Sequence, residues 1–354
     1  MSRVSKIKVD GTASIKQATK LLNETGMQIV LVVDENDLLL GTITDGDIRR
    51  AILTGLDMSE PATRVMNRSP HVLFENERDR AVAFMKEKVI RAVPLIDADR
   101  RVQDLVSWMD RSGEKQPDTF ETKTNPVFIL AGGKGTRLKP FTKILPKPLI
   151  PIGDVPILEI IMERLQGFGF SDFVLSLNYK AAMIKAYFSE MGDKFSLDYV
   201  EEEQFLGTGG SLHLIKDRVK ESVLVTNCDV IIDLNFDEYL SYHKKSGFDA
   251  SVVGVMRHVK IQYGVIGMEQ GELTTLTEKP EYDYVVNAGI YILEPHVLDY
   301  VEDNKYLDMP TLLLRVKEGG GRVGVYPVSA EMIDVGHWEE YKKAVEHLHR
   351  FDIV

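Results

Sequence analysis

Short apolar runs alternate with segments of helical periodicity through residues 126–227. A short apolar run bounded by turn residues is typical of a buried strand, whereas apolar residues at every third or fourth position indicate a helix. The pattern predicts helices at 155–168 and 180–189 and strands at 126–131, 173–178, 197–200 and 223–227. Such alternation favours an α/β fold with a mixed, mainly parallel sheet and helices on both faces. Ligands bind beyond the carboxyl ends of such strands, so we expect the turns after 126–131 and 223–227 to face each other.

A weaker pattern occurs twice in the first third of the chain. It predicts a helix, two strands and a further helix in each copy, with helices at 14–24 and 78–88 and strand pairs at 29–33 with 38–44 and 92–96 with 102–107. Copies of this length usually pack on each other. The polar stretch 111–125 (RSGEKQPDTFETKTN) has no aliphatic side chain and no helical period, which is typical of a linker. We therefore predict a repeat domain at 1–112 (copies at about 1–60 and 61–112), a linker at 113–125 and a second domain at 126–354.

Composition and charge narrow the class of protein. The 354 residues suffice for two or three domains, and 44% hydrophobic with 27% charged residues is ordinary for a soluble globular protein. The formal net charge of -11 argues against general nucleic-acid binding. The single cysteine, Cys228, excludes an internal disulfide framework. The sequence has neither a secretory pattern at its N-terminus nor a stretch of the roughly 18–20 apolar residues that span a bilayer. We expect a cytoplasmic protein without nucleic-acid or membrane partners.

The segment 130–148 (LAGGKGTRLKPFTKILPKP) is the strongest candidate for ligand chemistry. Three glycines allow backbone N–H groups to approach a phosphate closely, and Arg137 adds a fixed cationic fork. The segment fits neither the P-loop pattern nor the dinucleotide fingerprint, because Lys134 precedes Gly135 and position 138 is leucine. A glycine-rich turn can also be purely structural.

The order G-G-x-G-T-R-L, followed about ten residues later by P-K-P, resembles the signature of the sugar-1-phosphate nucleotidylyltransferases. The resemblance implies a Rossmann-like nucleotidyltransferase domain that joins a nucleoside triphosphate to a sugar-1-phosphate and releases pyrophosphate. It assigns catalytic roles to Arg137 and Lys147. It also implies a nucleotide-binding turn formed by Leu130, Gly132, Gly133, Lys134, Gly135 and Thr136.

A second glycine turn in 199–212 (YVEEEQFLGTGGSL) follows three carboxylates. By the same resemblance this stretch contacts the base and ribose, through Glu202, Glu203, Gly207 and Thr208. Guanine presents two adjacent N–H donors that one carboxylate can accept together, so the run favours GTP. The stretch resembles guanylyltransferases of the mannose and heptose type, although Gln204 and Phe205 replace the usual proline-containing spacing. The alternative is a solvated acidic run.

Two aspartates are predicted to bind Mg2+. Asp229 follows the predicted strand 223–227 in TNCD, where the family has N-G-D, and Asp334 lies in MIDVGHW, which resembles the family stretch I-D-x-G-T. Mg2+ usually takes one or two carboxylates together with substrate phosphates. A lone aspartate at a strand end can instead form a cap or turn.

Further residues between these aspartates follow the family order of sugar-phosphate contacts. The resemblance assigns this role to Gly264, Glu278, Lys279 and Asn287, although a sequence such as E-K-P is also common in surface turns. The histidines, including His337, show no metal-ligand spacing tied to these motifs, and no Ser-His-Asp or Cys-His arrangement is recognisable.

The repeated N-terminal pattern resembles a tandem pair of CBS domains, a module that often binds adenine nucleotides. The first copy has Gly41, Thr44 and Asp47 in the order G-x-x-T-x-x-D, whereas the second has Asp104 in the glycine position, followed by Ser107 and Asp110. The resemblance makes Thr44, Asp47, Ser107 and Asp110 candidate ligands of an adenine nucleotide. Helix capping explains the same residue types equally well, and a CBS pair can serve only for association.

The two resemblances together favour a guanylyltransferase that uses GTP, Mg2+ and a sugar-1-phosphate. The combination of domains resembles the glucosamine-1-phosphate guanylyltransferases of nonulosonic (legionaminic) acid biosynthesis. Mannose-1-phosphate and heptose-1-phosphate stay open as substrates, and so does a non-catalytic nucleotide sensor. We expect a homo-oligomer, because paired CBS modules commonly associate.

Overall fold

The computed structural model describes residues 3–25, 27, 29–88, 90, 92–107, 120–328, 330 and 332–346. The chain forms two compact units, each built from several segments. One unit comprises Met1–Lys115, Gly254–Val286 and Pro327–Ala330, and the other comprises Gln116–Val253, Asn287–Tyr326 and Glu331–Val354. Most of the predicted linker lies outside the described residues, and the domain boundaries given above stay a prediction.

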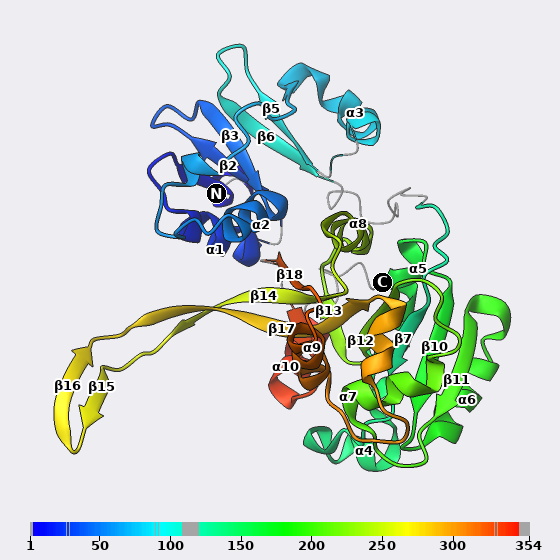
Figure 1. Ribbon diagram of the computed structural model, residues 1–354. Coiled ribbons are helices and arrows are strands. Elements are labelled where there is room, and N and C mark those ends of the chain that lie inside the picture. Colours follow the sequence, from blue (N-terminus) through cyan, green and yellow to red (C-terminus); the bar gives the residue numbers. More distant parts are fainter. Residues whose placement is uncertain are drawn as a thin grey trace. The chain divides into compact units, whose positions relative to one another are not determined.

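A seven-stranded sheet forms the core of the chain from residue 127 onward (Figure 1). In spatial order its strands are β11 (Ser196–Glu201), β10 (Asp172–Leu177), β7 (Val127–Leu130), β12 (Val223–Asn227), β17 (Glu281–Leu293), β14 (Ala250–Lys260) and β18 (Val323–Val328). The first four strands are mutually parallel, and β17 runs antiparallel to β12. Leu130 lies opposite both Ser176 and Asn227, so β7, β10 and β12 end together at one edge. The predicted mixed, mainly parallel sheet is confirmed.

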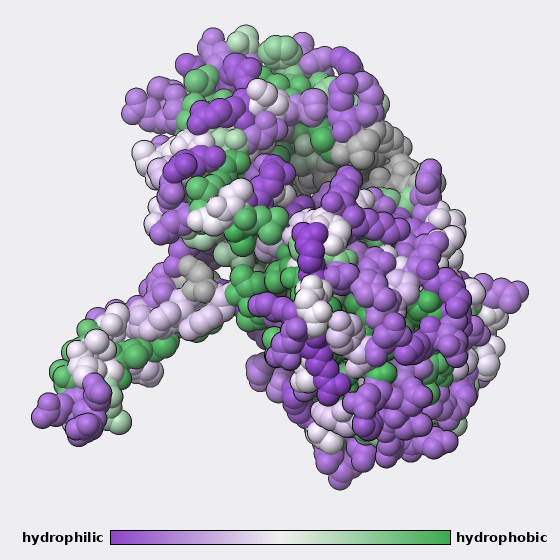
Figure 2. Space-filling model, in the orientation of Figure 1, coloured by the Kyte–Doolittle hydropathy of each residue, from purple (hydrophilic) through white to green (hydrophobic). Residues whose placement is uncertain are grey.

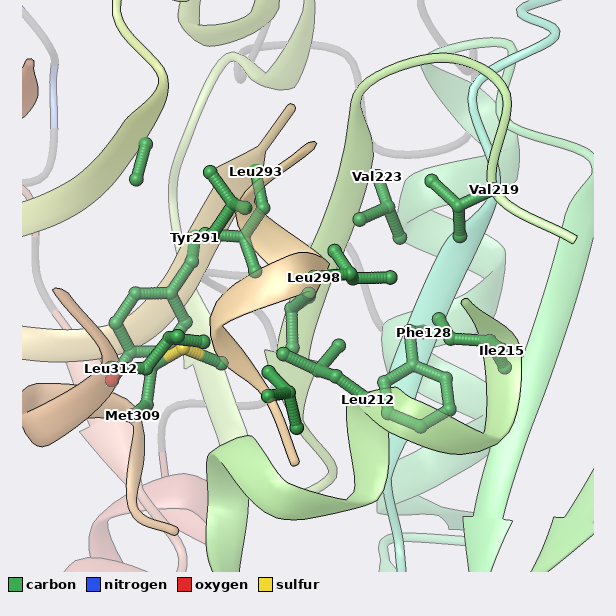
Figure 3. Packing of buried hydrophobic residues seen from close by; sticks show 14 of the residues in the cluster. Phe128, Leu212, Ile215, Val219, Val223, Tyr291, Leu293, Leu298, Met309 and Leu312 are labelled. Atoms are coloured by element: carbon green, nitrogen blue, oxygen red, sulfur yellow. The ribbon is translucent and has the colours of Figure 1, made fainter. Parts of the chain in front are cut away.

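Both faces are buried at the centre of this sheet. Successive residues of β7, Val127, Phe128 and Ile129, point to alternate faces, and each is fully shielded from solvent. Figure 3 shows one face, where Phe128, Val223 and Tyr291 pack against Leu212 and Met309. The helices of this part are α4 (Phe141–Ile144), α5 (Ile157–Gly167), α6 (Ala181–Ser189), α7 (Gly207–Gly210), α8 (Phe236–Ser246), α9 (Met309–Glu318) and α10 (Trp338–Glu346), with 3-10 turns at Ser211–Ile215 and Pro295–Tyr300.

A buried histidine of α8 packs near the amino end of β12. His243 is fully buried, with Nδ1 2.8 Å from the Ser251 hydroxyl and Nε2 3.1 Å from a carboxylate oxygen of Glu294. That Glu294 oxygen also accepts a hydrogen bond of 2.8 Å from Ser222. Burial lowers the pKa of His243 despite the opposing influence of Glu294. The imidazole is therefore a neutral structural group.

The N-terminal part contains two copies of one small motif. In the first copy β1 (Lys8–Asp10) pairs parallel with β2 (Ile29–Val33), which pairs antiparallel with β3 (Leu39–Thr44). In the second copy β4 (Leu73–Phe74), β5 (Ala92–Ile96) and β6 (Val102–Ser107) repeat this order. The associated helices are α1 (Ile15–Thr25), α2 (Asp45–Leu53) and α3 (Ala81–Lys88).

The two copies share a hydrophobic core. Leu31 and Leu39 of the first copy pack with Ile96 and Leu105 of the second. Leu39 N–H also donates to the Arg100 carbonyl at 3.0 Å. A second core, built around Ile15, Val30 and Ile48 of the first copy, is covered in part by Met256 of β14.

A long β-hairpin belongs to the same unit as these repeats. Its outer part consists of β15 (Val265–Glu269) and β16 (Glu272–Thr277), which pair antiparallel (Figure 1). At the base of the hairpin, Glu281 accepts hydrogen bonds from Lys260 at 2.9 Å and from Lys16 of α1 at 3.4 Å. No helix within the described part of the chain has the length and apolar character needed to cross a membrane.

Candidate active site

The first glycine turn leaves β7 at the common edge of the parallel strands. Two of its glycines are closely packed: a Cβ on Gly132 would lie 3.0 Å from Oε1 of Glu202, and one on Gly135 would lie 2.8 Å from Thr142. Gly135 also has a φ of 58°. By contrast, a Cβ on Gly133 would meet nothing within 4 Å. Gly133 and Lys134 are exposed, so this side of the turn is accessible to a ligand.

Arg137 follows this turn and is held by a residue from the end of the chain. Its Nη1 donates to Nε2 of His337 at 3.0 Å, which requires the neutral imidazole with its proton on Nδ1. The neighbouring Trp338 opens α10 and donates from Nε1 to the Lys139 carbonyl at 3.2 Å. Its ring lies 4.8 Å from that of Phe141. His337 and Trp338, the first residue of α10, therefore contact the segment from Arg137 to Phe141.

Lys147 and Asp229 form an ion pair in a largely buried position. Lys147 opens the 3-10 turn Lys147–Leu149, and Asp229 lies between β12 and β13 (Val230–Ile232). The antiparallel pairing of β13 with β19 (Met332–Asp334) places Val230 opposite Asp334. The Val335 amide also donates to the Asp229 carbonyl at 2.8 Å. Three predicted site residues, far apart in sequence, thus meet at one place.

The charges of this cluster are unequal. Burial lowers the pKa of Lys147, but the carboxylates of Asp229 and Asp334 more than offset this and hold that pKa above its ordinary value. Burial, followed by repulsion from Asp229, raises the pKa of Asp334. Burial also raises the pKa of the Cys228 thiol to about 12, so it is protonated at neutral pH and is not a nucleophile.

The donor set of this cluster fits Mg2+. Two carboxylates face one lysine, which leaves a net negative charge when both are ionised, and carboxylate oxygens are the ligands that Mg2+ prefers. Within the described ranges no group of three or more His, Cys, Asp or Glu side chains is placed to hold a metal. Asp229 and Asp334 could therefore hold the ion only together with substrate phosphates and water.

Glu202, the candidate base contact, is buried at the carboxyl end of β11. Its Oε1 accepts from the Ser176 hydroxyl at 2.7 Å, and its Oε2 accepts from the Leu206 amide at 3.0 Å. Asn178 donates to its backbone carbonyl at 2.7 Å. The carboxylate is therefore fixed beside Gly132, with a second lone pair on each oxygen still open to a donor. Glu203 is exposed.

The second glycine turn is used for packing. Gly207 has a φ of 77°, and a Cβ there would lie 2.5 Å from the Leu307 carbonyl oxygen. The same oxygen accepts from the amides of Gly209 and Gly210, each at 2.9 Å. The Thr208 hydroxyl accepts from the Met309 amide at 2.9 Å. The side chain of Thr208 and the glycines thus bind segment 305–309, a contact that the motif alone does not reveal.

Asn287 lies in β17. Its side-chain amide donates to the Tyr291 hydroxyl at 2.9 Å, and its carbonyl oxygen accepts from the Gly289 amide at 2.8 Å. Gly289 has a φ of 72°, and a Cβ there would lie 2.3 Å from the side-chain nitrogen Nδ2 of Asn227. Asn227, which precedes Cys228 and Asp229, was not among the candidate residues predicted from the sequence.

The other three candidate sugar-phosphate residues belong to the unit that contains the repeats. Gly264 directly precedes β15, and Glu278 and Lys279 directly follow β16. Both charged side chains are exposed, with Lys279 Nζ 3.9 Å from the Glu278 carboxylate. Their assignment to a sugar site stays a prediction.

The candidate CBS ligands of the first copy form a helix cap. Asp47 is buried, and its Oδ2 accepts from the Thr44 amide at 2.8 Å and from the Thr44 hydroxyl at 2.7 Å, while Oδ1 pairs with Arg50. The capping interpretation therefore accounts for these two side chains. In the second copy Asp104 pairs with Arg78. Ser107 is buried at the end of β6, and Asp110 lies outside the described residues.

His337 is the main site residue that sequence analysis missed. Its position does not match the spacing of metal-binding or catalytic-triad histidines. Its partner, Arg137, lies 200 residues earlier in the chain, so the contact is not visible in the local sequence. The signal available in the sequence was only its place, three residues after Asp334 in the MIDVGHW stretch.

The sheet, the accessible glycine turn and the Lys147–Asp229–Asp334 cluster define a nucleotide-binding α/β protein of the transferase type. The chain belongs to the nucleotidyl transferase family, whose family model matches residues 127–350. The family model described as the CBS domain matches residues 1–54.

Curated relatives are similar over part of their length. The mannose-1-phosphate guanyltransferase of Debaryomyces hansenii is 37% identical over 188 residues, which is 49% of this chain and 51% of that protein. The UTP–glucose-1-phosphate uridylyltransferase of Synechocystis sp. is 30% identical over 241 residues, or 62% of each protein. The chain thus spans about half the length of the guanyltransferases that it matches.

Among solved structures, HddC from Yersinia pseudotuberculosis aligns with a TM-score of 0.52 and 28% identity, covering 63% of this chain and 99% of that one. The same protein complexed with GMP-PN aligns with a TM-score of 0.51 and 26% identity, over the same shares. A UDP-glucose pyrophosphorylase complexed with UDP-glucose has a TM-score of 0.50 at 21% identity, a similarity of fold alone.

Proposed function

We propose that the chain is a sugar-1-phosphate nucleotidylyltransferase. In this reaction a phosphate oxygen of the sugar-1-phosphate attacks the α-phosphorus of a nucleoside triphosphate, and the bond to the β-phosphate breaks to release pyrophosphate. The observation that carries the proposal is the meeting of Lys147, Asp229 and Asp334 at the edge where β7 and β12 end. Family membership supports the same reaction.

The residues can perform this transfer without a general base. The attacking phosphate is already anionic near neutral pH, so the protein must mainly position the two substrates and neutralise charge. Arg137 and Lys134, both exposed beside the glycine turn, would bind the departing pyrophosphate. Lys147 would bridge the two phosphates as they approach. Asp229 and Asp334 would hold Mg2+, which when bound supplies Lewis-acid stabilisation of phosphate charge.

The nucleotide that we propose is GTP. Glu202 is fixed at the strand edge by Ser176 and the Leu206 amide, and a carboxylate can accept both N–H donors on the Watson–Crick edge of guanine. The similarity to a mannose-1-phosphate guanyltransferase and to HddC, whose structure includes a complex with GMP-PN, supports this base. We expect Glu202→Gln to reduce the preference for GTP over ATP by about tenfold, because an amide offers one acceptor where the carboxylate offers two.

For the sugar, we propose glucosamine-1-phosphate, as in nonulosonic (legionaminic) acid biosynthesis. This choice rests on the resemblance of the combined CBS and transferase domains to that group of enzymes. Mannose-1-phosphate is the alternative that the names of the curated relatives favour. The predicted contacts, Gly264, Glu278, Lys279 and Asn287, would serve either sugar.

We further propose a tandem CBS pair at 1–112 that binds an adenine nucleotide, in a cytoplasmic homo-oligomer. The two copies of the motif and their shared core support the pair. The side chains of Thr44 and Asp47 already cap α2, so backbone groups there would make most ligand contacts.

The deciding experiment measures pyrophosphate release by the full chain with Mg2+. ATP, GTP, CTP, UTP and dTTP are each combined with glucosamine-, mannose-, glucose- and heptose-1-phosphate, and Arg137→Ala serves as the matched control. Turnover confined to GTP and one sugar, and reduced by about 10²–10³ in the control, supports the proposal and names the substrate. Preference for a pyrimidine nucleotide contradicts the guanine assignment.

A second candidate function is a nucleotide sensor without turnover, which the family model for the CBS domain at residues 1–54 favours. Absence of turnover with every pair, in a chain that binds an adenine nucleotide by calorimetry, would establish this second function and contradict the first.

A further inference from the structure

The turn between β10 and α6 contacts two parts of the candidate nucleotide site. We call its residues, Asn178, Tyr179 and Lys180, the linking turn. The Asn178 side chain donates to the Glu202 carbonyl at 2.7 Å, and the Tyr179 amide donates to the Gly132 carbonyl at 3.3 Å. The linking turn therefore holds the strand end that carries the candidate base contact and also the first glycine turn.

The linking turn also binds the carbonyl end of helix α4. The last carbonyls of a helix have no acceptor role within it and need a donor from elsewhere. The Tyr179 hydroxyl donates to the Thr142 carbonyl at 3.2 Å. Lys180 donates from Nζ to the Lys143 and Ile144 carbonyls at 2.7 and 2.5 Å. Two neighbouring side chains thus hold three successive carbonyls of α4, in the way that a lysine can cap a helix end.

Lys180 makes these contacts from an unfavourable backbone conformation. Its φ of 55° and ψ of 35° lie in the left-handed region, where glycine is favoured and a residue with a Cβ costs free energy. Such strain persists where the surrounding structure fixes it, and it is common at functional sites. Nζ also lies 5.3 Å from the centre of the Tyr179 ring, within the range of a cation–π contact. The reach of the ammonium group to α4 is what a lysine, and not a glycine, provides here.

Helix α4 lies in the middle of the segment that carries the proposed phosphate-binding cations. The hydroxyl of the buried Thr142 donates to the Gly135 carbonyl at 2.9 Å. A Cβ on Gly135 would lie 3.0 Å from the Cβ of Lys147, so the two ends of segment 135–147 pack together. Arg137 and Lys147 both belong to this segment, and a shift of α4 would therefore move both cations.

We propose that Lys180, supported by Tyr179, is a positioning residue for phosphoryl transfer, an inference that rests on the proposed function. Its ammonium group holds α4, and the linking turn thereby fixes Arg137 and Lys147 relative to Glu202. A misplacement of about 1 Å in such groups can lower a rate about 10²-fold. All these contacts lie within one compact unit of the chain. They differ from the contacts that α10 makes with the same segment.

The test compares pyrophosphate release by three variants of the full chain. Lys180→Met keeps the methylene chain and removes the ammonium group, whereas Lys180→Arg keeps a cationic donor. Lys185→Met is the matched control, because Lys185 lies on α6 and pairs with Glu201 of β11. The surface around α6 is mainly hydrophilic on the side that Figure 2 shows, so one more apolar side chain there should not cause association.

We expect Lys180→Met to lower kcat about 10–100-fold, and Lys180→Arg to recover most of that loss. Lys185→Met should match the wild type. A merely structural role predicts a different result, namely a lower melting temperature with an unchanged kcat for the folded enzyme. That result, or equal losses in Lys180→Met and Lys180→Arg, overturns the positioning role.

A second measurement does not need turnover. Hydrogen exchange followed by mass spectrometry should show faster exchange in segment 134–147 for Lys180→Met than for Lys185→Met, because an anchor of the segment is lost. Tyr179→Phe loses only a hydroxyl and should show a smaller change in the same direction, which keeps the test available if Lys180→Met does not fold. Exchange equal to that of the wild type overturns the anchoring. A wild type without turnover overturns the proposed function instead, and hydrogen exchange then decides the anchoring alone.

Discussion

Gly207→Ala should destabilise the protein far more than its small size suggests. The residue has a φ of 77°, where an alanine costs about 1–2 kcal/mol through contact of Cβ with the backbone. Its Cβ would also lie 2.5 Å from the Leu307 carbonyl oxygen, and ordinary contact begins at 3.4 Å, so one of the two must move by 3.4 − 2.5 = 0.9 Å. That oxygen accepts from Gly209 and Gly210 at 2.9 Å, and moving it lengthens both hydrogen bonds beyond normal range.

The size of the effect follows from these two contributions. Each weakened hydrogen bond costs about 1 kcal/mol, so the clash adds about 2 kcal/mol to the backbone strain. Gly320→Ala is the matched control, because Gly320 has a φ of 88° and a Cβ there would meet nothing within 4 Å. The stability of Gly320→Ala should fall only by the contribution of the backbone strain.

Thermal unfolding of both variants, followed by circular dichroism, tests the argument. One kcal/mol corresponds to about 2–4 °C for a domain of this size, so Gly207→Ala should melt about 4–8 °C below Gly320→Ala. Equal melting temperatures would refute the claim that the approach of Leu307 dictates glycine at position 207.

Four further predictions concern the site and the buried histidine. Arg137→Ala should lower kcat by about 10²–10³ with an unchanged melting temperature, measured by pyrophosphate release. Asp229→Asn should lower turnover and shift its dependence on Mg2+ to higher concentrations, because a metal ligand is lost; an unchanged Mg2+ titration would contradict its role. His337→Ala should lower kcat about tenfold, and His337→Gln should recover most of that loss by accepting from Arg137; equal losses would exclude the positioning role. Burial depresses the pKa of His243 in the folded state, so below about pH 6.5 the unfolded chain gains a proton that the folded chain does not. The contribution of this group to the free energy of unfolding should therefore be constant above about pH 6.5 and should fall below it. Denaturant titrations of His243→Gln should show a smaller loss of stability at low pH than the wild type.

Strands of the parallel sheet could be predicted closely from the sequence. The predicted strands 173–178 and 223–227 correspond to Asp172–Leu177 and Val223–Asn227. A strand buried on both faces is mostly apolar, and this local property is visible in one sequence. The convergence of the turns after β7 and β12 followed from the rule for strand ends, and the structure places Leu130 opposite Asn227.

Contacts between distant segments could not be predicted in this way. Arg137 meets His337, and the Gly207 turn meets Leu307, because of the fold and not because of local spacing. The hairpin was missed for a different reason: the apolar residues of β15 and β16 are exposed, so their pattern does not report a buried core. Site residues that belong to a local motif were therefore predictable, whereas residues brought to the site by tertiary packing were not.

The contact of Met256 with the core of the first repeat has a consequence for how the protein can be divided. The repeat-containing unit is discontinuous in sequence, because Gly254–Val286 and Pro327–Ala330 belong to it. Truncation after residue 112 would remove Met256 from the core around Ile15 and Val30 and leave apolar surface open to water. Conversely, a chain that starts at residue 126 would retain strands β14 and β17 without the partner of Met256. The chain passes several times between the two units. A fusion protein that carries either unit should therefore include all the segments of that unit and not one continuous stretch of sequence.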